Sequence, residues 1–259
     1  MTVREPSVSL LVLCRNEGRN LLNNRDRLLE LLDRAAKEGH PAEAILQGDG
    51  STDETPAVIA DFAASDPRVR GFAEPARKGK GGALSAAAAS ARGRYLVMLD
   101  ADVPLDTSTL ARILKELDGG TQVVLPSRRH PRSQVERIPV TRRLPSKLFN
   151  VVVNLLLGLS IADTQCGVKG FPRDVFDLVR PRRFLGYEMD LEMLARARRA
   201  GLRLREIPIG YRHGRDSGFS VLRDGPRMLA AVWRIRRAMQ AGEFDPPAGA
   251  SSRRDAPKG

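Results

Sequence analysis

The sequence has little cysteine, few aromatic residues and no long apolar run. Its two cysteines, Cys14 and Cys166, match no metal-ligand or redox spacing, so we expect buried free thiols in a reducing, cytoplasmic setting. Aromatic residues make up only 5% of the chain, and no helix-turn-helix, zinc-finger or aromatic-rich RNA motif is present, which argues against nucleic acid as a partner. The longest apolar stretch, residues 148–161, contains two asparagines and is shorter than the roughly 20 residues of a membrane span.

Positive charge is present in excess. The 259 residues include 43 Lys and Arg against 31 Asp and Glu, which gives a net charge of +12 and a pI near 10.6. Such a chain favours an anionic partner: a nucleoside diphosphate, a lipid phosphate, an anionic membrane surface or nucleic acid. Charge alone does not choose among these. The polar start of the chain shows no signal peptide, and 42% hydrophobic residues suffice for a buried core.

Short apolar runs alternate with helical patterns through the first half of the chain. Strands are predicted at 8–13, 44–46, 69–73, 95–99 and 122–125, with helices at about 21–32, 54–64, 81–91 and 107–117. This alternation is typical of an α/β fold with a Rossmann-like, mostly parallel sheet flanked by helices.

The pattern changes after Pro126. Residues 127–145 are basic and rich in helix breakers, which predicts a long functional loop. Helices are expected at about 146–159, 188–200 and 226–239, and a strand at 203–209. We therefore divide the chain into an N-terminal extension (1–7), one domain (8–240) with halves 8–126 and 127–240, and a disordered tail (241–259).

Polar or charged turns follow four of the predicted strands, at the sheet edge where open α/β folds bind ligands. The turn after residue 99 carries Asp100 and Asp102, whose carboxylates at i and i+2 are suited to one Mg²⁺ or Mn²⁺ ion together with diphosphate oxygens. Capping of the following helix is the alternative for this pair. Residues 77–82 offer backbone N–H groups and three cations to a diphosphate, without matching a P-loop. A solvated basic turn is the alternative there.

Taken together, these motifs resemble a known family. Segments 12–20, 49–55, 79–83 and 99–102 are similar to family 2 glycosyltransferases of the GT-A fold. Segments 163–171, 187–194 and 205–209 resemble its polyprenyl-phosphate branch, and dolichyl-phosphate β-glucosyltransferase-like enzymes are nearest. The resemblance covers roughly residues 8–240. It implies an inverting, metal-dependent hexosyltransferase that uses a nucleotide sugar, with UDP-glucose favoured.

The resemblance also assigns roles to individual positions. It implies a nucleotide-sugar site of Asn16, Glu17, Asp49, Lys80, Gly81 and Asp100; metal ligands Asp102 and Asp100; an acceptor-phosphate site of Arg128, Arg142, Arg143 and Ser146; sugar or acceptor contacts from Asp163, Gln165 and Glu192; and catalytic roles for Asp190, Arg128 and Lys80.

The sequence departs from the family pattern at a few positions. Gly48 precedes Asp49 where two acids are usual, and Arg77 stands where many members carry Asn. Pro104 replaces a Gln that is frequent in the mannosyl branch, which weakens a mannosyl assignment. No membrane spans follow Ile209, unlike in many lipid-linked relatives.

The sequence is compatible with two classes of sugar acceptor. A polyprenyl phosphate is already ionised at neutral pH and needs alignment rather than a base. A soluble hydroxyl acceptor would need a base, for which Asp190 or Glu192 are candidates. The apolar helix after residue 148 and the basic face near Arg234 to Arg237 would suit peripheral attachment to the inner face of the membrane, whereas core or homodimer packing is the alternative.

Overall fold

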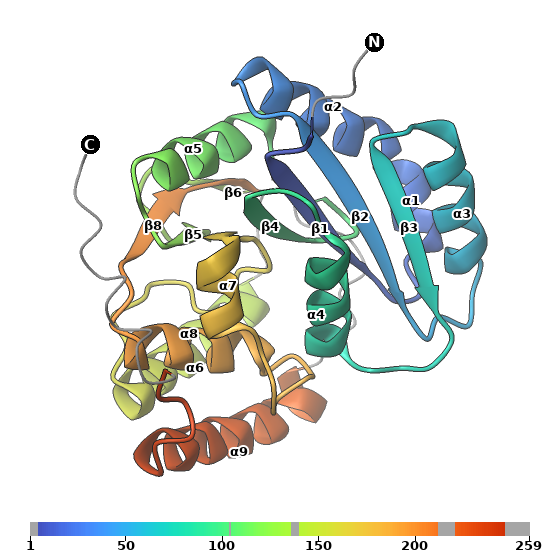
Figure 1. Ribbon diagram of the computed structural model, residues 1–259. Helices are drawn as coiled ribbons and strands as arrows, with labels where there is room; N and C mark the ends of the chain where they lie inside the picture. The colour runs from blue at the N-terminus through green and yellow to red at the C-terminus, as the bar shows by residue number, and fades with distance from the viewer. Residues whose placement is uncertain (1–4, 104, 136–139, 212–220, 247–259) are drawn as a thin grey trace.

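A seven-stranded sheet forms the centre of the computed structural model, which describes residues 5–103, 105–135, 140–211 and 221–246, without the side chains of 140–145 and 221–224 (Figure 1). The strand order is β3-β2-β1-β4-β7-β5-β8, and a separate two-stranded sheet pairs β6 with β9. The strands are β1 (Val8–Cys14), β2 (Ala42–Asp49), β3 (Val69–Glu74), β4 (Tyr95–Asp100), β5 (Val123–Ser127), β6 (Gln134–Val135), β7 (Lys169–Pro172), β8 (Leu204–Pro208) and β9 (Gly210–Tyr211).

Helices cover both faces of the sheet. The helices are α1 (Gly18–Asn23), α2 (Arg25–Lys37), α3 (Thr55–Ser65), α4 (Lys80–Ser90), α5 (Thr107–Asp118), α6 (Val140–Leu157), α7 (Arg173–Val179), α8 (Met189–Arg199) and α9 (Val221–Gln240). Apolar residues of α1, α2, α3 and α5 share one core cluster, and those of α4 and α6 to α9 share the other. None of the described helices meets the length and hydropathy that crossing a membrane requires.

The predicted α/β class is confirmed. The five strands expected in the first half are present, and β1 runs parallel to β2 and β4, as does β2 to β3. All residues of β1 and β2 are buried, as in the central strands of a parallel sheet that is covered on both faces. Cys14 and Cys166 are buried and free, as expected.

Two elements of the second half differ from the prediction. The segment before Pro172, expected to be irregular, contains β7, which runs antiparallel between β4 and β5. Its four residues include a lysine, a glycine and a proline, so they carry no period-2 apolar pattern. Helix α6 begins at Val140, so the last six residues of the predicted loop 127–145, Pro145 included, lie in a helix.

The predicted disordered tail, 241–259, is ordered in the part that the structure describes. Phe244 is 2% exposed, and the guanidinium of Arg196 lies 4.5 Å from its ring centroid. Arg199 of α8 pairs with Asp245. Residues 244 and 245 therefore pack against α8, and 247–259 lie outside the described residues.

Candidate functional site

The carboxyl ends of β1, β2 and β4 lie side by side at one edge of the sheet. In the strand register Leu13 faces Asp100, and Cys14 faces Gly48. The residues that follow β1, β2 and β4 therefore meet at this edge, as the sequence predicted from the alternation of strands and helices.

Asn16 links the first two of these turns. Its backbone N–H donates to Ser51 Oγ at 3.1 Å, and its side-chain oxygen accepts from the backbone N–H of Thr52 at 2.9 Å. The φ of Asn16 is 55°, in the left-handed region that asparagine tolerates better than most residues. Asn16 thus fixes the shape of the predicted nucleotide-sugar site.

Asp49 holds the glycine-rich turn in the same way. Its Oδ1 accepts from the backbone N–H groups of Lys78 at 2.5 Å and Gly79 at 3.1 Å. Gly79 has a φ of 82°, and a Cβ there would collide with the carbonyl oxygen of Leu185, which itself accepts from Gly81 N–H at 2.9 Å. The turn is clamped between β2 and the segment before α8, so its glycines are required by close approach.

Lys80, the first residue of α4, reaches across to β4. Its Nζ lies 2.7 Å from Asp100 Oδ1. Burial lowers the pKa of Lys80, but the carboxylates of Asp100 and Asp190 outweigh it and leave that pKa raised. Burial raises the pKa of Asp100, and Lys80 outweighs that effect, so the pKa is lowered. Both groups are therefore charged at neutral pH.

Asp102 is the unsatisfied group at this edge. Its Oδ1 is buried and accepts no hydrogen bond in the described part of the chain. Burial, followed by the nearby charge of Asp100, raises its pKa to about 6. Burial also raises the pKa of Glu17, and Asp102 and Asp100 contribute to that shift. The three carboxyl groups therefore lie close enough to repel one another.

These residues fit a divalent cation that takes its remaining ligands from a substrate. A buried carboxylate oxygen without a partner is costly, and a cation removes that cost. Among the described residues, no three His, Cys, Asp or Glu side chains are arranged to hold a metal by themselves. Mg²⁺ and Mn²⁺ accept one or two carboxylates together with diphosphate oxygens and water, which matches Asp102 and Asp100.

The raised pKa of Asp102 predicts an unusual stability profile in the metal-free protein. A carboxyl whose pKa rises from 3.8 to about 6 on folding favours the protonated form, so its ionisation weakens the fold as pH rises through that window. In EDTA, we expect Asp102→Asn to be more stable than wild type at pH 7, with the difference vanishing near pH 4. Urea unfolding at both pH values measures this; a variant less stable at both would contradict it.

Arg128 and Asp163, both predicted to lie on the acceptor side, form a bidentate ion pair in which Asp163 is buried and Arg128 is half-buried. Arg128 Nε lies 2.7 Å from Asp163 Oδ2 and Nη2 lies 2.8 Å from Oδ1, and the backbone N–H of Arg128 also donates to Asp163. Glu206 accepts from the backbone N–H groups of Ala162 and Asp163 and so fixes the loop. The positive charge of Arg128 also contributes to lowering the pKa of Asp100, so the Arg128–Asp163 pair lies near the sheet edge that carries Asp100.

The structure describes only some of the other residues that were predicted to contact the acceptor. Ser146, predicted to help hold the acceptor phosphate, accepts from Arg129 Nη2 at 2.8 Å. The neighbouring residue Arg129 had no role in the prediction. The side chains of Arg142 and Arg143 lie outside the described residues. Gln165 is half-buried on the loop that carries Asp163.

Lys169 is a site residue that the sequence did not single out. It is buried at the start of β7, and its Nζ donates to Asp190 Oδ1 at 2.5 Å and to the carbonyl of Cys166 at 2.7 Å. On the same loop, a Cβ at Gly167 would collide with Asp100 Oδ2. Asp190, Lys169 and Asp100 are thereby brought together. The sequence signal that could have identified Lys169 is that it stands alone as a charged residue in segment 166–172, which otherwise contains glycine and apolar residues.

Glu192 does not border the site, contrary to the prediction. It is fully buried in α8, and its carboxylate accepts from the backbone N–H groups of Arg182, Arg183 and Phe184. Arg196 pairs with it at 2.7 Å. Both oxygens are occupied, so Glu192 is a structural residue that holds the segment before α8.

This reassignment predicts a stability effect. Glu192→Ala leaves Arg196 and three backbone N–H groups without their partner, and we expect a loss of about 3–5 kcal/mol in the free energy of unfolding. Glu188→Ala, at a half-buried position without such bonds, serves as the matched control. Urea denaturation compares the two, and equal losses would refute the structural role.

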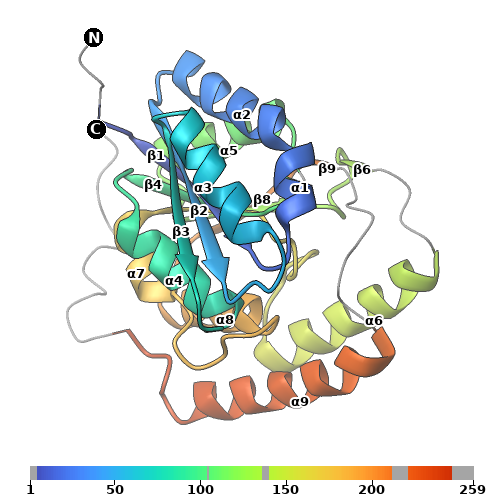
Figure 2. The ribbon, with the colours of Figure 1, turned by 90° about the vertical axis from the view of Figure 1, so that its right-hand side faces the viewer.

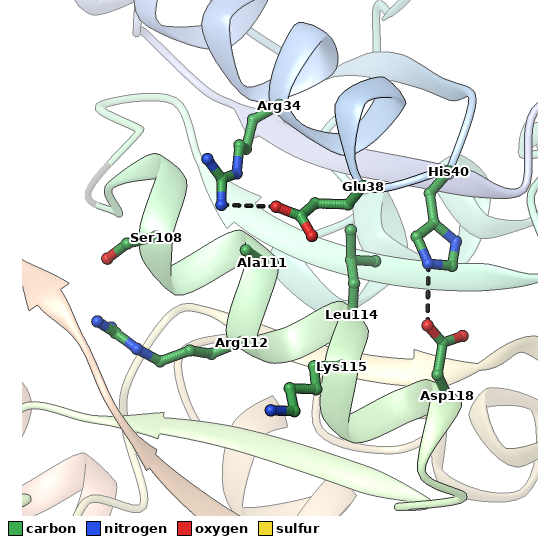
Figure 3. A pocket seen from close by; sticks show the side chains of 9 residues that line it. All are labelled: Arg34, Glu38, His40, Ser108, Ala111, Arg112, Leu114, Lys115 and Asp118. Carbon is green, nitrogen blue, oxygen red and sulfur yellow. Dashed lines mark hydrogen bonds and ion pairs between the residues drawn. The ribbon is translucent and has the colours of Figure 1, made fainter.

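A hollow of about 440 Å³ lies elsewhere, between α2 and α5 (Figure 3). Its lining includes Arg34, His40 and Lys115, and the His40–Asp118 pair closes one end. None of the predicted site residues lines it, so it is separate from the carboxylate edge.

Comparison with known proteins places the chain in a family. Residues 9–179 match the profile of the family described as "Glycosyl transferase family 2". A glycosyltransferase, AglD, from Haloferax volcanii is 32% identical over 88% of this chain, which spans only 37% of that relative's length. Dolichyl-phosphate beta-glucosyltransferase ALG5A from Trichomonas vaginalis is 30% identical, over 81% of this chain and 68% of its own length.

The fold has solved counterparts. Glucosyl-3-phosphoglycerate synthase from Mycobacterium tuberculosis, in complex with Mn²⁺, UDP-glucose and phosphoglyceric acid, superposes with a TM-score of 0.65. The comparison covers 94% of this chain and 82% of that one, at 18% identity. The fold is therefore that of the GT-A glycosyltransferases, as the sequence predicted.

Proposed function

The chain belongs to glycosyl transferase family 2, and from this premise we propose that it transfers a hexose, with glucose favoured, from a nucleoside-diphosphate sugar to a polyprenyl phosphate with inversion. The observation that carries the proposal is the unpartnered buried oxygen of Asp102 beside the Lys80–Asp100 pair. The same edge of the sheet thus holds a buried carboxylate oxygen that a divalent cation would satisfy and the ammonium group of Lys80, which is suited to binding phosphate.

The donor half of the proposal uses residues 8–126. A divalent ion held by Asp102 and Asp100 would supply positive charge next to the diphosphate. Lys80 then stabilises the negative charge that develops on the departing nucleoside diphosphate. The turn at Gly79, fixed by Asp49, keeps backbone N–H groups and Lys80 in place before the substrate arrives.

The acceptor half uses residues 127–240. One phosphate oxygen of the acceptor attacks the anomeric carbon while the bond from that carbon to the diphosphate breaks, which inverts the configuration. A phosphate monoester is already a dianion near neutral pH, so no proton has to be removed. Arg128, which lies near Asp100, is suited to align that dianion through its planar guanidinium.

The surroundings of the two candidate bases favour the phosphate acceptor over a hydroxyl. Asp190 is paired with the ammonium of Lys169 at 2.5 Å and is also close to Lys80. The ammonium of Lys169 therefore occupies Oδ1 of this carboxylate. Both oxygens of Glu192 are occupied by structural bonds. The similarity to a dolichyl-phosphate beta-glucosyltransferase supports the same acceptor class.

A thermal-shift panel of nucleotide sugars with Mn²⁺ tests the donor. We expect UDP-glucose with Mn²⁺ to raise the melting temperature more than UDP-glucose with EDTA, and more than GDP-mannose with Mn²⁺. A larger shift with GDP-mannose would overturn the preference for glucose. A shift that is the same with and without metal would overturn the metal site.

A further inference from the structure

Exposed apolar side chains gather on two helices that pack against each other. Of the seven large apolar side chains that are exposed among the described residues, five lie on α6 and α9: Leu148, Val151, Leu155, Leu229 and Trp233. Leu155 is 75% exposed and Trp233 is 55% exposed. Figure 2 shows α6 and α9 side by side, at the end of the molecule farthest from α2.

These five side chains form one surface, here called the α6–α9 face. Positions 148, 151 and 155 are three and four residues apart and so lie on one side of α6, and 229 and 233 likewise share one side of α9. Arg236 of α9 donates to the carbonyl of Leu156 in α6 at 2.6 Å. Arg236 is one turn from Trp233, and Leu156 adjoins Leu155. The exposed apolar side chains of α6 and those of α9 therefore lie on either side of the contact between the two helices.

The charges on these two helices are mostly basic. Exposed basic residues flank the surface, Lys147 on α6 and Arg237 on α9. Helix α6 contains no acidic residue, and α9 contains one, Asp224, in its first turn. A second copy of the same surface would therefore bring like charges together, whereas an anionic lipid surface complements them.

The opposite side of α6 holds the acceptor loop. The side-chain amide of Asn150 donates to the carbonyl of Ile161 at 2.9 Å, and its oxygen accepts from the backbone N–H of Thr164 at 3.1 Å. Asp163, the partner of Arg128, lies between these two residues. One helix thus presents apolar side chains outward and fixes the acceptor site with its other side.

We propose that the α6–α9 face lies on an anionic phospholipid bilayer and so brings Arg128 to the level of the lipid headgroups. Helices of this kind lie in the plane of the interface, with leucine and tryptophan in the acyl boundary and basic side chains among the phosphates. The supply of a polyprenyl phosphate at this surface rests on the proposed function. The attachment itself does not.

Sedimentation with vesicles tests the attachment. The full chain is mixed with phosphatidylcholine vesicles that contain or lack phosphatidylglycerol, without any substrate. We expect binding that requires the anionic lipid and falls at least about tenfold in the double variant Leu155→Glu/Trp233→Glu. Leu22→Glu, at a leucine on α1 that is 53% exposed, should bind as wild type does. Thermal unfolding checks that all variants are folded.

A second pair of variants tests the role of charge. Lys147→Glu combined with Arg237→Glu should weaken binding to anionic vesicles at least about tenfold. Lys115→Glu on α5, which lies at the other end of the molecule, should not (Figures 1 and 2). Equal effects from both sites would mean that net charge, and not this surface, directs attachment.

Activity measurements separate this proposal from the proposed function. With a long-chain polyprenyl phosphate in vesicles, the Leu155→Glu/Trp233→Glu variant should be at least about tenfold slower, and with water-soluble farnesyl phosphate it should equal wild type. Vesicle binding unaffected by this variant, or a wild-type dimer that the variant converts to monomer, would overturn the docking surface. Wild type that binds vesicles but glycosylates neither lipid phosphate would overturn the proposed function alone.

Discussion

Asp102→Asn is expected to lower kcat by about 100- to 1000-fold, the loss typical of removing one group that stabilises transition-state charge. The substitution keeps the shape of the side chain but removes the charge that a divalent ion needs at the buried, unpartnered oxygen. Initial rates as a function of Mn²⁺ concentration measure the effect. They should show a weaker apparent affinity for the ion as well as a lower maximum rate.

The matched control for this variant is Asp61→Asn. Asp61 lies on α3, is largely exposed and pairs only with Arg25 in the described structure, so its loss should change kcat by less than about twofold. Binding of Mn²⁺ followed by its paramagnetic resonance, in the presence of UDP, gives a readout that a merely structural change would leave unaltered. An Asp102→Asn protein that retains metal-dependent turnover would refute the assigned ligand.

Arg128→Lys is expected to lower kcat/KM for a polyprenyl phosphate by about 100-fold. Lysine keeps the positive charge but cannot make the two parallel bonds that join Arg128 to Asp163, so the cation that aligns the acceptor is misplaced. Binding of the nucleotide sugar should change little, because the donor residues belong to the other half of the domain. Titration of UDP-glucose by thermal shift, together with transfer rates, separates the two effects.

Arg129→Lys controls for the loss of an arginine next to the same site. Arg129 makes an exposed bond to Ser146, so we expect less than about a threefold change. Slow transfer of the sugar to water distinguishes alignment from chemistry: Arg128→Lys should leave this hydrolysis intact. A parallel fall in hydrolysis and transfer would place Arg128 on the donor side and contradict its assignment to the acceptor.

Much of the predicted nucleotide-sugar site, at the carboxyl ends of β1, β2 and β4, could be located from the sequence. Strands buried on both faces are continuous apolar runs, so the ends of β1, β2 and β4 could be located, and the carboxyl ends of neighbouring parallel strands must meet. The chemistry of Asp100 and Asp102 follows from that position. Among the described residues, Oδ1 of Asp102 has no hydrogen-bond partner while Asp100 is paired with Lys80, and this difference depends on packing that the sequence does not specify.

The second half was harder to predict, since its functional residues are set by long-range contacts. Lys169 reaches Asp190 only because the antiparallel strand β7 inserts between β4 and β5, and a four-residue strand has no detectable period. Glu192 lies two positions after Asp190 in the sequence, but successive helical positions point in different directions. It therefore faces the segment before α8 instead of the site.

The most direct measurement follows the acceptor phosphate itself. The chain is incubated with UDP-glucose, Mn²⁺ and a polyprenyl phosphate, and ³¹P resonances are recorded with time. We expect the monoester signal of the lipid to be replaced by a phosphodiester signal at the rate at which UDP appears, and Asp102→Asn to slow both changes by about 100- to 1000-fold. Release of UDP with an unchanged lipid monoester, and sugar found instead on a hydroxyl acceptor, would contradict it.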